Sequence, residues 1–140
     1  MTSEIVNLPW IPAIGTQLRK AGVYFDAIRV HGRRGERAAQ QLVVEEGGNP
    51  GPIVRELAGA GWVYFIVPPG TVAPMRWPSE AQKFSSATRS SVAFVGIPAL
   101  DGDTWPLAWR NPPSPERQFC DVARLNTIVW DQSPMWPILG

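Results

Sequence analysis

The sequence predicts one α+β domain with a largely antiparallel sheet and two helices. Its 140 residues are enough to bury a single core. Fifteen prolines and thirteen glycines divide the chain into short segments and exclude long helices over most of its length. Apolar residues make up 44% and charged residues 18%, a globular composition. The predicted order is strand, helix, strand hairpin, loop, strand hairpin, helix.

An irregular arm is expected over residues 1–20, because prolines interrupt it and no periodicity is sustained. Leu8, Trp10 and Ile11 are expected to fold this arm over a body that spans residues 21–130.

The body begins with a strand and a helix. Gly22–Val30 is rich in β-branched and aromatic residues, which predicts a strand. From Gly35 to Glu46, apolar residues recur at helical spacing, and Gly47-Gly48-Asn49-Pro50 ends the predicted helix.

Two hairpins are predicted next. Pro52–Leu57 and Trp62–Val67 form the first. A long connection over residues 68–90 follows, with a short helical turn near Ser79–Phe84. Val92–Ile97 and Trp105–Arg110 form the second, across the turn Asp101-Gly102-Asp103.

A second helix is predicted to begin at Ser114, because a serine followed by Pro115 and Glu116 suits a helix N-terminus. Its apolar side is expected to include Phe119 and Leu125, and the tail over residues 131–140 is expected to be irregular.

Location and redox chemistry follow from simple counts. No apolar run approaches the roughly 18 residues of a membrane helix, and the N-terminus lacks the pattern of a secretory signal. A cytoplasmic location is therefore expected. Cys120 is the only cysteine, which excludes an intramolecular disulfide and favours a small core residue.

One basic segment stands out in a chain of net charge +1. It covers residues 31–37, at the predicted strand-to-helix junction, where free amides and the helix dipole favour anions. An equally supported alternative is a solvated loop whose arginines pair with Glu36, Glu45 or Glu46. The candidate nucleic-acid or phosphate contacts are Arg29, His31, Arg33, Arg34 and Arg37.

Seven tryptophans are many for this length. Trp62, Trp105 and Trp109 lie in predicted strands and are expected to be core or sheet-face residues. Trp10, Trp77 and Trp136 stand beside prolines, and they are candidates to stack on a ligand or to cap the core. An aromatic patch could also support self-association.

Other catalytic patterns are weak. Asp101-Gly102-Asp103 is better explained as a turn than as a cation site. His31 is the sole histidine, so every triad or multi-histidine zinc scheme would depend on one residue. The serine-rich tract over residues 85–91 has no glycine elbow, which favours a flexible loop.

Five segments, in this order and spacing, resemble the primase-polymerase-like domains of actinobacterial and phage-related proteins, within the archaeo-eukaryotic primase class. The resemblance implies an RRM-like sheet. It is carried by Phe25–Val30, Gly51–Val54, Gly61–Gly70, Val92–Pro98 and Trp109–Pro113.

The same resemblance implies an active site that has lost its chemistry. The family's first motif has two acids one residue apart, whereas here Asp26 is followed by Ala27 and Ile28. Trp62 or Val63 fills the position of the motif histidine, and Ser90–Val92 stands where the third acid would fall. No catalytic residue, metal or other cofactor is therefore expected, and Asp26 is a residual motif position.

Three functions are compatible with these features. The first is a non-catalytic domain that binds DNA, other nucleic acid or a nucleotide through the basic strand–helix junction. The second is a regulatory module that binds a protein partner or forms a homo-oligomer. The third is a metal-dependent enzyme that uses Asp26. No membrane partner is expected.

Overall fold

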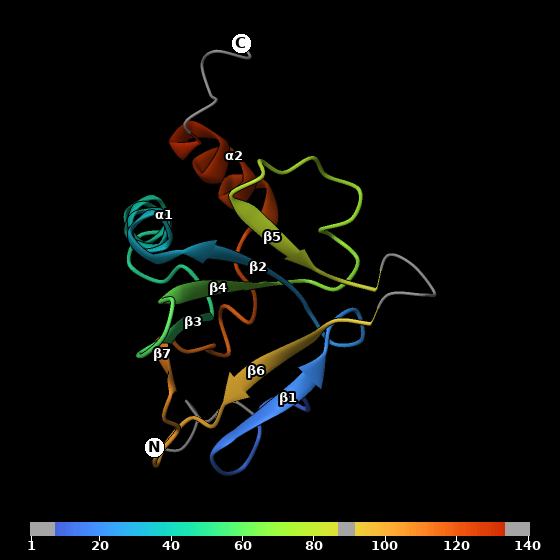
Figure 1. Cartoon of the computed structure of the whole chain (residues 1–140), viewed down its shortest axis with the longest axis vertical. Helices are drawn as coiled ribbons and strands as arrows, with labels where there is room; N and C mark the ends of the chain where they lie inside the picture. The colour runs from blue at the N-terminus through green and yellow to red at the C-terminus, as the bar shows by residue number, and fades with distance from the viewer. Residues whose placement is uncertain (1–7, 87–91, 134–140) are drawn as a thin grey trace.

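A computed structural model describes residues 8–86 and 92–133. The predicted α+β class is confirmed, with seven strands and two helices in these ranges (Figure 1). In chain order they are β1 (Thr16–Lys20), β2 (Asp26–His31), α1 (Gly32–Glu45), β3 (Ile53–Glu56), β4 (Trp62–Val67), β5 (Ala81–Phe84), β6 (Phe94–Pro98), β7 (Leu107–Asn111) and α2 (Val122–Gln132).

Five strands form the central sheet, in the order β5-β2-β4-β3-β7. Every neighbouring pair is antiparallel. The order β5-β2-β4-β3, with α1 between β2 and β3, makes the sheet RRM-like. The predicted hairpin of β3 and β4 is confirmed.

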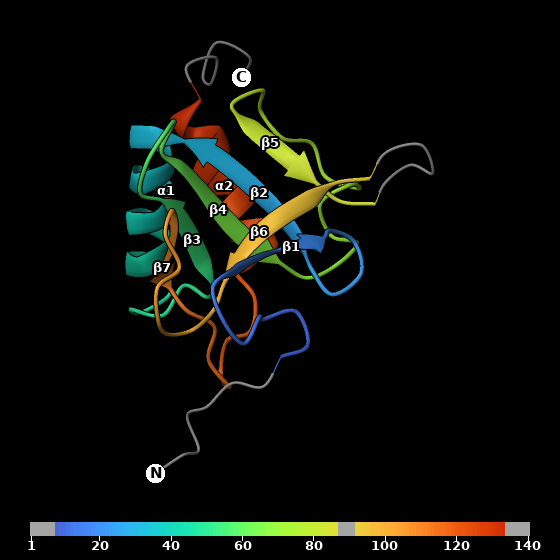
Figure 2. The same cartoon turned by 60° about the horizontal axis from the view of Figure 1, so that its bottom comes forward.

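The two faces of this sheet carry different layers. α1 and α2 cover one face, while β1 and β6 form a separate two-stranded ribbon over the other (Figure 2). Leu42 of α1 and Ile128 of α2 pack with Ile28 and Phe65 in the core on the helix side. Opposite them, a second core contains Ile66 of the sheet and Ile97 of the ribbon.

The N-terminal arm packs as expected but is not wholly irregular. Trp10 is 2% exposed, and Leu8 and Ile11 pack against the same core, as predicted. The expectation of an irregular segment up to residue 20 was wrong, because Thr16–Lys20 forms β1 by pairing with β6. The arm's alternation of apolar and polar residues is too short to predict a strand without that partner.

β5 replaces the expected helical turn at residues 79–84. Ala81–Phe84 pairs with Ala27–Val30 of β2, whose ladder would otherwise end at an open edge. The Pro-Ser-Glu sequence before β5 resembles a helix start, but the long-range pairing prevails.

The predicted second hairpin was also wrong. β6 pairs with β1, whereas β7 pairs with β3. Leu107 and Trp109 join the ribbon-side core from the edge of the central sheet, and the Trp109 indole N–H donates to the carbonyls of Pro98 and Ala99 at 3.2 and 3.1 Å. β7 therefore meets β6 through side chains, while its backbone pairs with β3.

α2 begins eight residues later than Ser114. The Ser114 hydroxyl does accept from the Arg117 N–H, at 3.1 Å, but this closes only a turn. Cys120 then donates its N–H to Ile66 of β4 at 2.8 Å, which holds the chain against the sheet. Asp121 is the actual N-cap and accepts from the Arg124 N–H at 3.0 Å.

Cys120 is buried, as expected of a small core residue. Its thiol donates to the Pro52 carbonyl at 3.3 Å, and burial raises the pKa of the Cys120 thiol. No helix within residues 8–86 and 92–133 is long and apolar enough to cross a membrane.

Candidate ligand site at the strand–helix junction

The junction between β2 and α1 is a single tight step. Gly32 has φ +49°, a conformation that glycine adopts at low cost, and donates its N–H to the Gly61 carbonyl at 3.0 Å. α1 therefore begins directly after the strand, three residues earlier than predicted. His31 is its N-cap, but the side chain makes no capping hydrogen bond, and the first turn has no acidic residue. This end of α1 is electropositive.

A hollow of about 310 Å³ opens beside this junction. The β2–α1 turn, β4 and the β5 edge all contribute to it. Its lining residues are Val30, His31, Arg33, Arg34, Trp62, Ser79, Glu80 and Gln82.

Arg29 lies on the sheet face opposite the helices and stacks on a tryptophan. Its guanidinium carbon is 3.9 Å from the centroid of the Trp62 ring, which makes a cation–π contact. Its Nε donates to Gln82 Oε1 at 2.7 Å, and a terminal nitrogen donates to the Tyr64 hydroxyl at 3.1 Å. These bonds hold the guanidinium in a fixed position.

Strand register explains why these side chains meet. Arg29 is directly opposite Tyr64 on β4 and Gln82 on β5, while His31 is opposite Trp62. Residues paired across an antiparallel ladder lie on the same face of the sheet. The His31 ring meets Trp62 edge-on, with 5.0 Å between the ring centroids. Arg29 and His31 therefore both contact the Trp62 ring.

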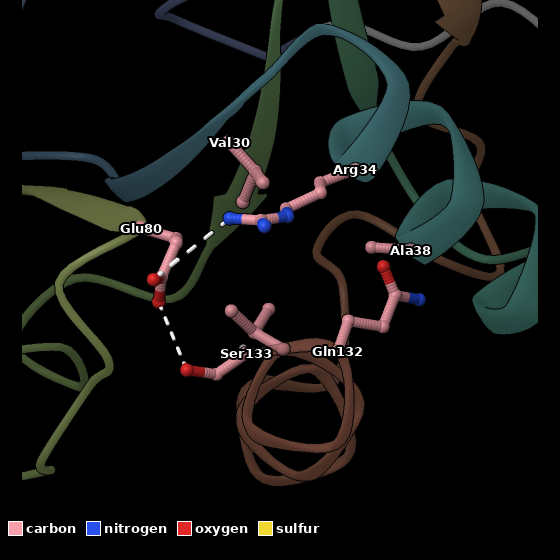
Figure 3. A pocket seen from close by; sticks show the side chains of 7 residues that line it. Val30, Arg34, Ala38, Glu80, Gln132 and Ser133 are labelled. Carbon is pink, nitrogen blue, oxygen red and sulfur yellow. Dashed lines mark hydrogen bonds and ion pairs between the residues drawn. The ribbon is translucent and has the colours of Figure 1, made fainter. Parts of the chain in front are cut away.

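Glu80 supplies a negative charge to the hollow. Its carboxylate is 3.8 Å from the Arg34 guanidinium and accepts from the Ser133 hydroxyl at 3.1 Å (Figure 3). A small cavity of about 10 Å³, lined in part by these three residues, lies between α1 and α2. It has room for about one water molecule at most, so the larger hollow is the better candidate ligand site.

The acids expected to neutralise the basic segment pair with other arginines. Glu36 contacts Arg110 at 3.0 Å and Arg55 at 3.7 Å. Glu45 and Glu46 contact Arg124 and Arg117. The predicted alternative, in which the arginines of residues 31–37 pair with Glu36, Glu45 or Glu46, is therefore wrong about these ion pairs. Within the described ranges, Arg33 and Arg37 have no ion-pair partner, so their charge is uncompensated by a direct contact.

The structure brings four of the five predicted basic positions together. His31, Arg33 and Arg34 line the hollow, and Arg29 supports its Trp62 wall. Arg37 is exposed further along α1 and is not among the lining residues.

The aromatic candidates lie elsewhere. Trp10 is buried in the ribbon-side core, which removes it from contact with a ligand. Trp77 packs against the helix-side core and donates its indole N–H to the Val72 carbonyl at 3.1 Å. Trp136 lies outside the described residues.

Sequence reasoning missed several parts of the site. Trp62 was expected only as a core or sheet-face residue, although its spacing of two from Tyr64 places both on one face of β4. Glu80 and Gln82 carried no comparable signal, because β5 was not predicted and residues 79–84 were expected to be helical.

Asp26 lies on the helix-covered face of the sheet, opposite to the face that carries Arg29, and its role there is structural. Its side chain is fully buried, and Oδ2 accepts from the N–H groups of Gly70 and Val72 at 3.0 and 3.2 Å. The other oxygen, Oδ1, has no hydrogen-bond partner among the described residues. Burial raises the pKa of Asp26, against the lowering effect of the backbone hydrogen bonds. No group of three or more potential metal-ligating residues occurs in the part of the chain that the structure describes.

Comparison with known proteins found no significant match: no family model, no curated protein and no solved structure matches this chain.

Proposed function

We propose that this domain is a non-catalytic module that binds nucleic acid, or a nucleotide, in the hollow at the β2–α1 junction. The convergence of His31, Arg33 and Arg34 with Trp62 in one 310 Å³ hollow supports this most strongly. Arginines contact phosphate, and an aromatic ring stacks on a base. The resemblance to primase-polymerase-like domains agrees with this proposal.

Single-stranded nucleic acid is the form that fits best. Trp62 is partly exposed and its ring is fixed by Arg29, so it offers a pre-positioned surface to an unpaired base. A base in a duplex is already stacked on its neighbours and could reach such a ring only after it is unpaired. The near-neutral net charge limits attraction to a local patch, because it provides no field over the whole surface.

The test is fluorescence anisotropy of a labelled single-stranded oligonucleotide, titrated with protein at several salt concentrations. We expect Arg33→Ala/Arg34→Ala to weaken binding and to lower the slope of log K against log salt by about 0.7 for each phosphate that the variant no longer neutralises. Arg76→Ala/Lys83→Ala is the matched control, because it removes the same charge from exposed positions outside the hollow.

A variant of opposite sign sharpens this test. Glu80→Gln should tighten binding, because it removes the carboxylate from the hollow and frees Arg34. Equal weakening by the two double variants, or no binding at low salt, would contradict the proposal.

The protein-interaction alternative has one observation in its favour, the exposed apolar side chains around the β1–β6 ribbon. Leu18, Val92, Phe94 and Trp105 are all more than half exposed. The metal-dependent alternative draws no comparable support, because Asp26 is inaccessible to solvent and bound to backbone N–H groups.

A further inference from the structure

In the part of the chain that the structure describes, the two-stranded ribbon leaves one side of β1 without a partner strand. Backbone hydrogen bonds to the β6 side are made by the Gly15 carbonyl, just before β1, and by the Ala21 N–H, just after it. In an antiparallel ladder, successive residues direct their backbone groups to alternate sides. The odd-numbered residues from 15 to 21 therefore face β6. The backbone groups directed away from β6 are those of Thr16, Leu18 and Lys20.

This outer edge of β1 is open among the described residues. Within residues 8–86 and 92–133, β6 is the only strand that pairs with β1, and Figure 1 shows β1 in blue on the outer side of the ribbon. The Leu18 carbonyl on this edge accepts only a weak hydrogen bond, from the Arg19 guanidinium at 3.4 Å. A row of unpaired backbone groups is a template for another strand.

Exposed apolar side chains lie beside the open edge. Leu18 is 68% exposed and Phe94 is 53% exposed. The register places Leu18 beside Gly96 and Phe94 beside Lys20, so both apolar side chains are on the outer face of the ribbon. Val95 points the other way, into the core. The apolar side chains on the outer face of the ribbon therefore lie next to the unpaired backbone groups along the β1 edge.

We propose that a second copy of this chain pairs with β1 edge to edge, antiparallel, across a two-fold axis at Leu18. Leu18 then lies opposite Leu18 of the second copy, and Thr16 lies opposite Lys20. Each of these pairs can exchange both backbone hydrogen bonds, because all of them belong to the outward-facing set. The result is a continuous four-stranded sheet in the order β6-β1-β1-β6.

Charge supports a second copy as the occupant. Arg19 lies opposite the neutral Gln17, so no like charges face each other in this register. Lys20 lies beside Thr16 of the second copy. The Thr16 hydroxyl donates to the Thr104 carbonyl at 2.9 Å, next to the exposed Asp103. Lys20 of one copy thereby comes, twice per dimer, to the Asp103–Thr104 segment of the other, which carries a negative charge.

Only this register uses the whole open edge. A shift by two residues in either direction leaves one of the outward-facing residues without an outward-facing partner in β1. It also separates the two Leu18 side chains and moves Lys20 away from Thr16. An isologous interface of this kind closes as a dimer.

Disulfide cross-linking of Leu18→Cys tests the register. Cα atoms of a hydrogen-bonded antiparallel pair lie about 5.5 Å apart, within the range for a disulfide. Cys120 is buried, so the introduced thiol is the accessible one. Val44→Cys is the matched control, because Val44 on α1 is also 68% exposed. We expect Leu18→Cys to form a covalent dimer under mild oxidation much faster than Val44→Cys. Equal rates would overturn the proposal.

Sedimentation equilibrium of the unmodified protein gives an independent readout. We expect a reversible dimer that Leu18→Lys abolishes and Val44→Lys retains, with circular dichroism to confirm that both variants fold. A wild-type protein that stays monomeric at millimolar concentration would refute the pairing. Neither experiment requires nucleic acid, so its outcome is separate from that of the proposed function.

Discussion

Asp26 and Arg29 lie three residues apart on β2 and point to opposite faces of the sheet. Asp26 faces the helix layer, where its carboxylate holds the chain after β4 through Gly70 and Val72. Arg29 is on the other face of the sheet, opposite the helices, and stacks on Trp62. The one acid that the family resemblance singled out is therefore a structural residue, and the proposed ligand site lies beside the arginine.

Replacing Asp26 by asparagine should change how stability depends on pH. Burial raises the pKa of Asp26 above its ordinary value of 3.8, so the native state holds this proton more tightly than the unfolded chain. The contribution of Asp26 to wild-type stability therefore falls as pH rises from about 3.8 through the native pKa, and it is constant above that pKa. Asp26→Asn lacks that titration.

The measurement is the urea-unfolding free energy of both proteins across this pH range. We expect the stability of Asp26→Asn relative to wild type to increase with pH and then level off. Parallel profiles would mean that the Asp26 pKa is the same in the folded and unfolded states. The amide oxygen of asparagine can still accept from the N–H groups of Gly70 and Val72, so the segment after β4 is expected to keep its conformation.

At the scale of elements, α1 lies unusually close to the sheet. A Cβ added to Gly35 would lie 2.6 Å from the Val30 carbonyl oxygen and 2.7 Å from the Val63 side chain. Gly35 therefore lets the first turns of α1 approach β2 and β4, and this approach sets the position of Arg33 and Arg34 beside the hollow.

Gly35→Ala should destabilise the protein, although alanine is normally the better helix former by about 1 kcal/mol. Overpacking against backbone and a buried valine costs about 1–3 kcal/mol and outweighs that gain. Urea unfolding measures the difference. The unfolding free energy of Arg37→Ala, at an exposed position of the same helix, should stay within about 0.5 kcal/mol of the wild-type value. A stabilised Gly35→Ala would contradict the close packing.

Elements with strong local signals were predictable from the sequence. The helical period identified α1, and the glycine turn between two apolar runs identified the hairpin of β3 and β4. β1 and β5 were missed because each is short and edge-like, with its pairing partner far away in sequence. The error carried into the site: without β5, nothing placed Gln82 beside Arg29.

The basic residues were found because they are consecutive, whereas their surroundings depend on tertiary contacts. Sequence alone could not show that Glu36 pairs with Arg55 and Arg110 rather than with the basic segment. The sequence also led to the wrong choice between two tryptophans. Trp10, beside a proline, was a ligand candidate but is buried, whereas Trp62, in a predicted strand, lines the hollow. Their surroundings are set by tertiary packing, which local sequence does not show.

For the whole molecule, the asymmetry of the two sheet faces is the main feature. The helices close one face with an apolar core. The ribbon and the N-terminal arm cover part of the other face, and Arg29, Trp62 and the hollow lie at the part near α1. The β1 edge lies on the ribbon, so nucleic-acid binding and pairing of two copies would use separate surfaces.

Amide chemical-shift mapping with a single-stranded oligonucleotide at low salt tests the binding site most directly. We predict that the shifts cluster at residues 29–34, Trp62 and Gln82, that they shrink as salt is raised, and that β1 and β6 are unaffected. Shifts confined to the ribbon, or no shifts at an oligonucleotide excess, would contradict a nucleic-acid site at the β2–α1 junction.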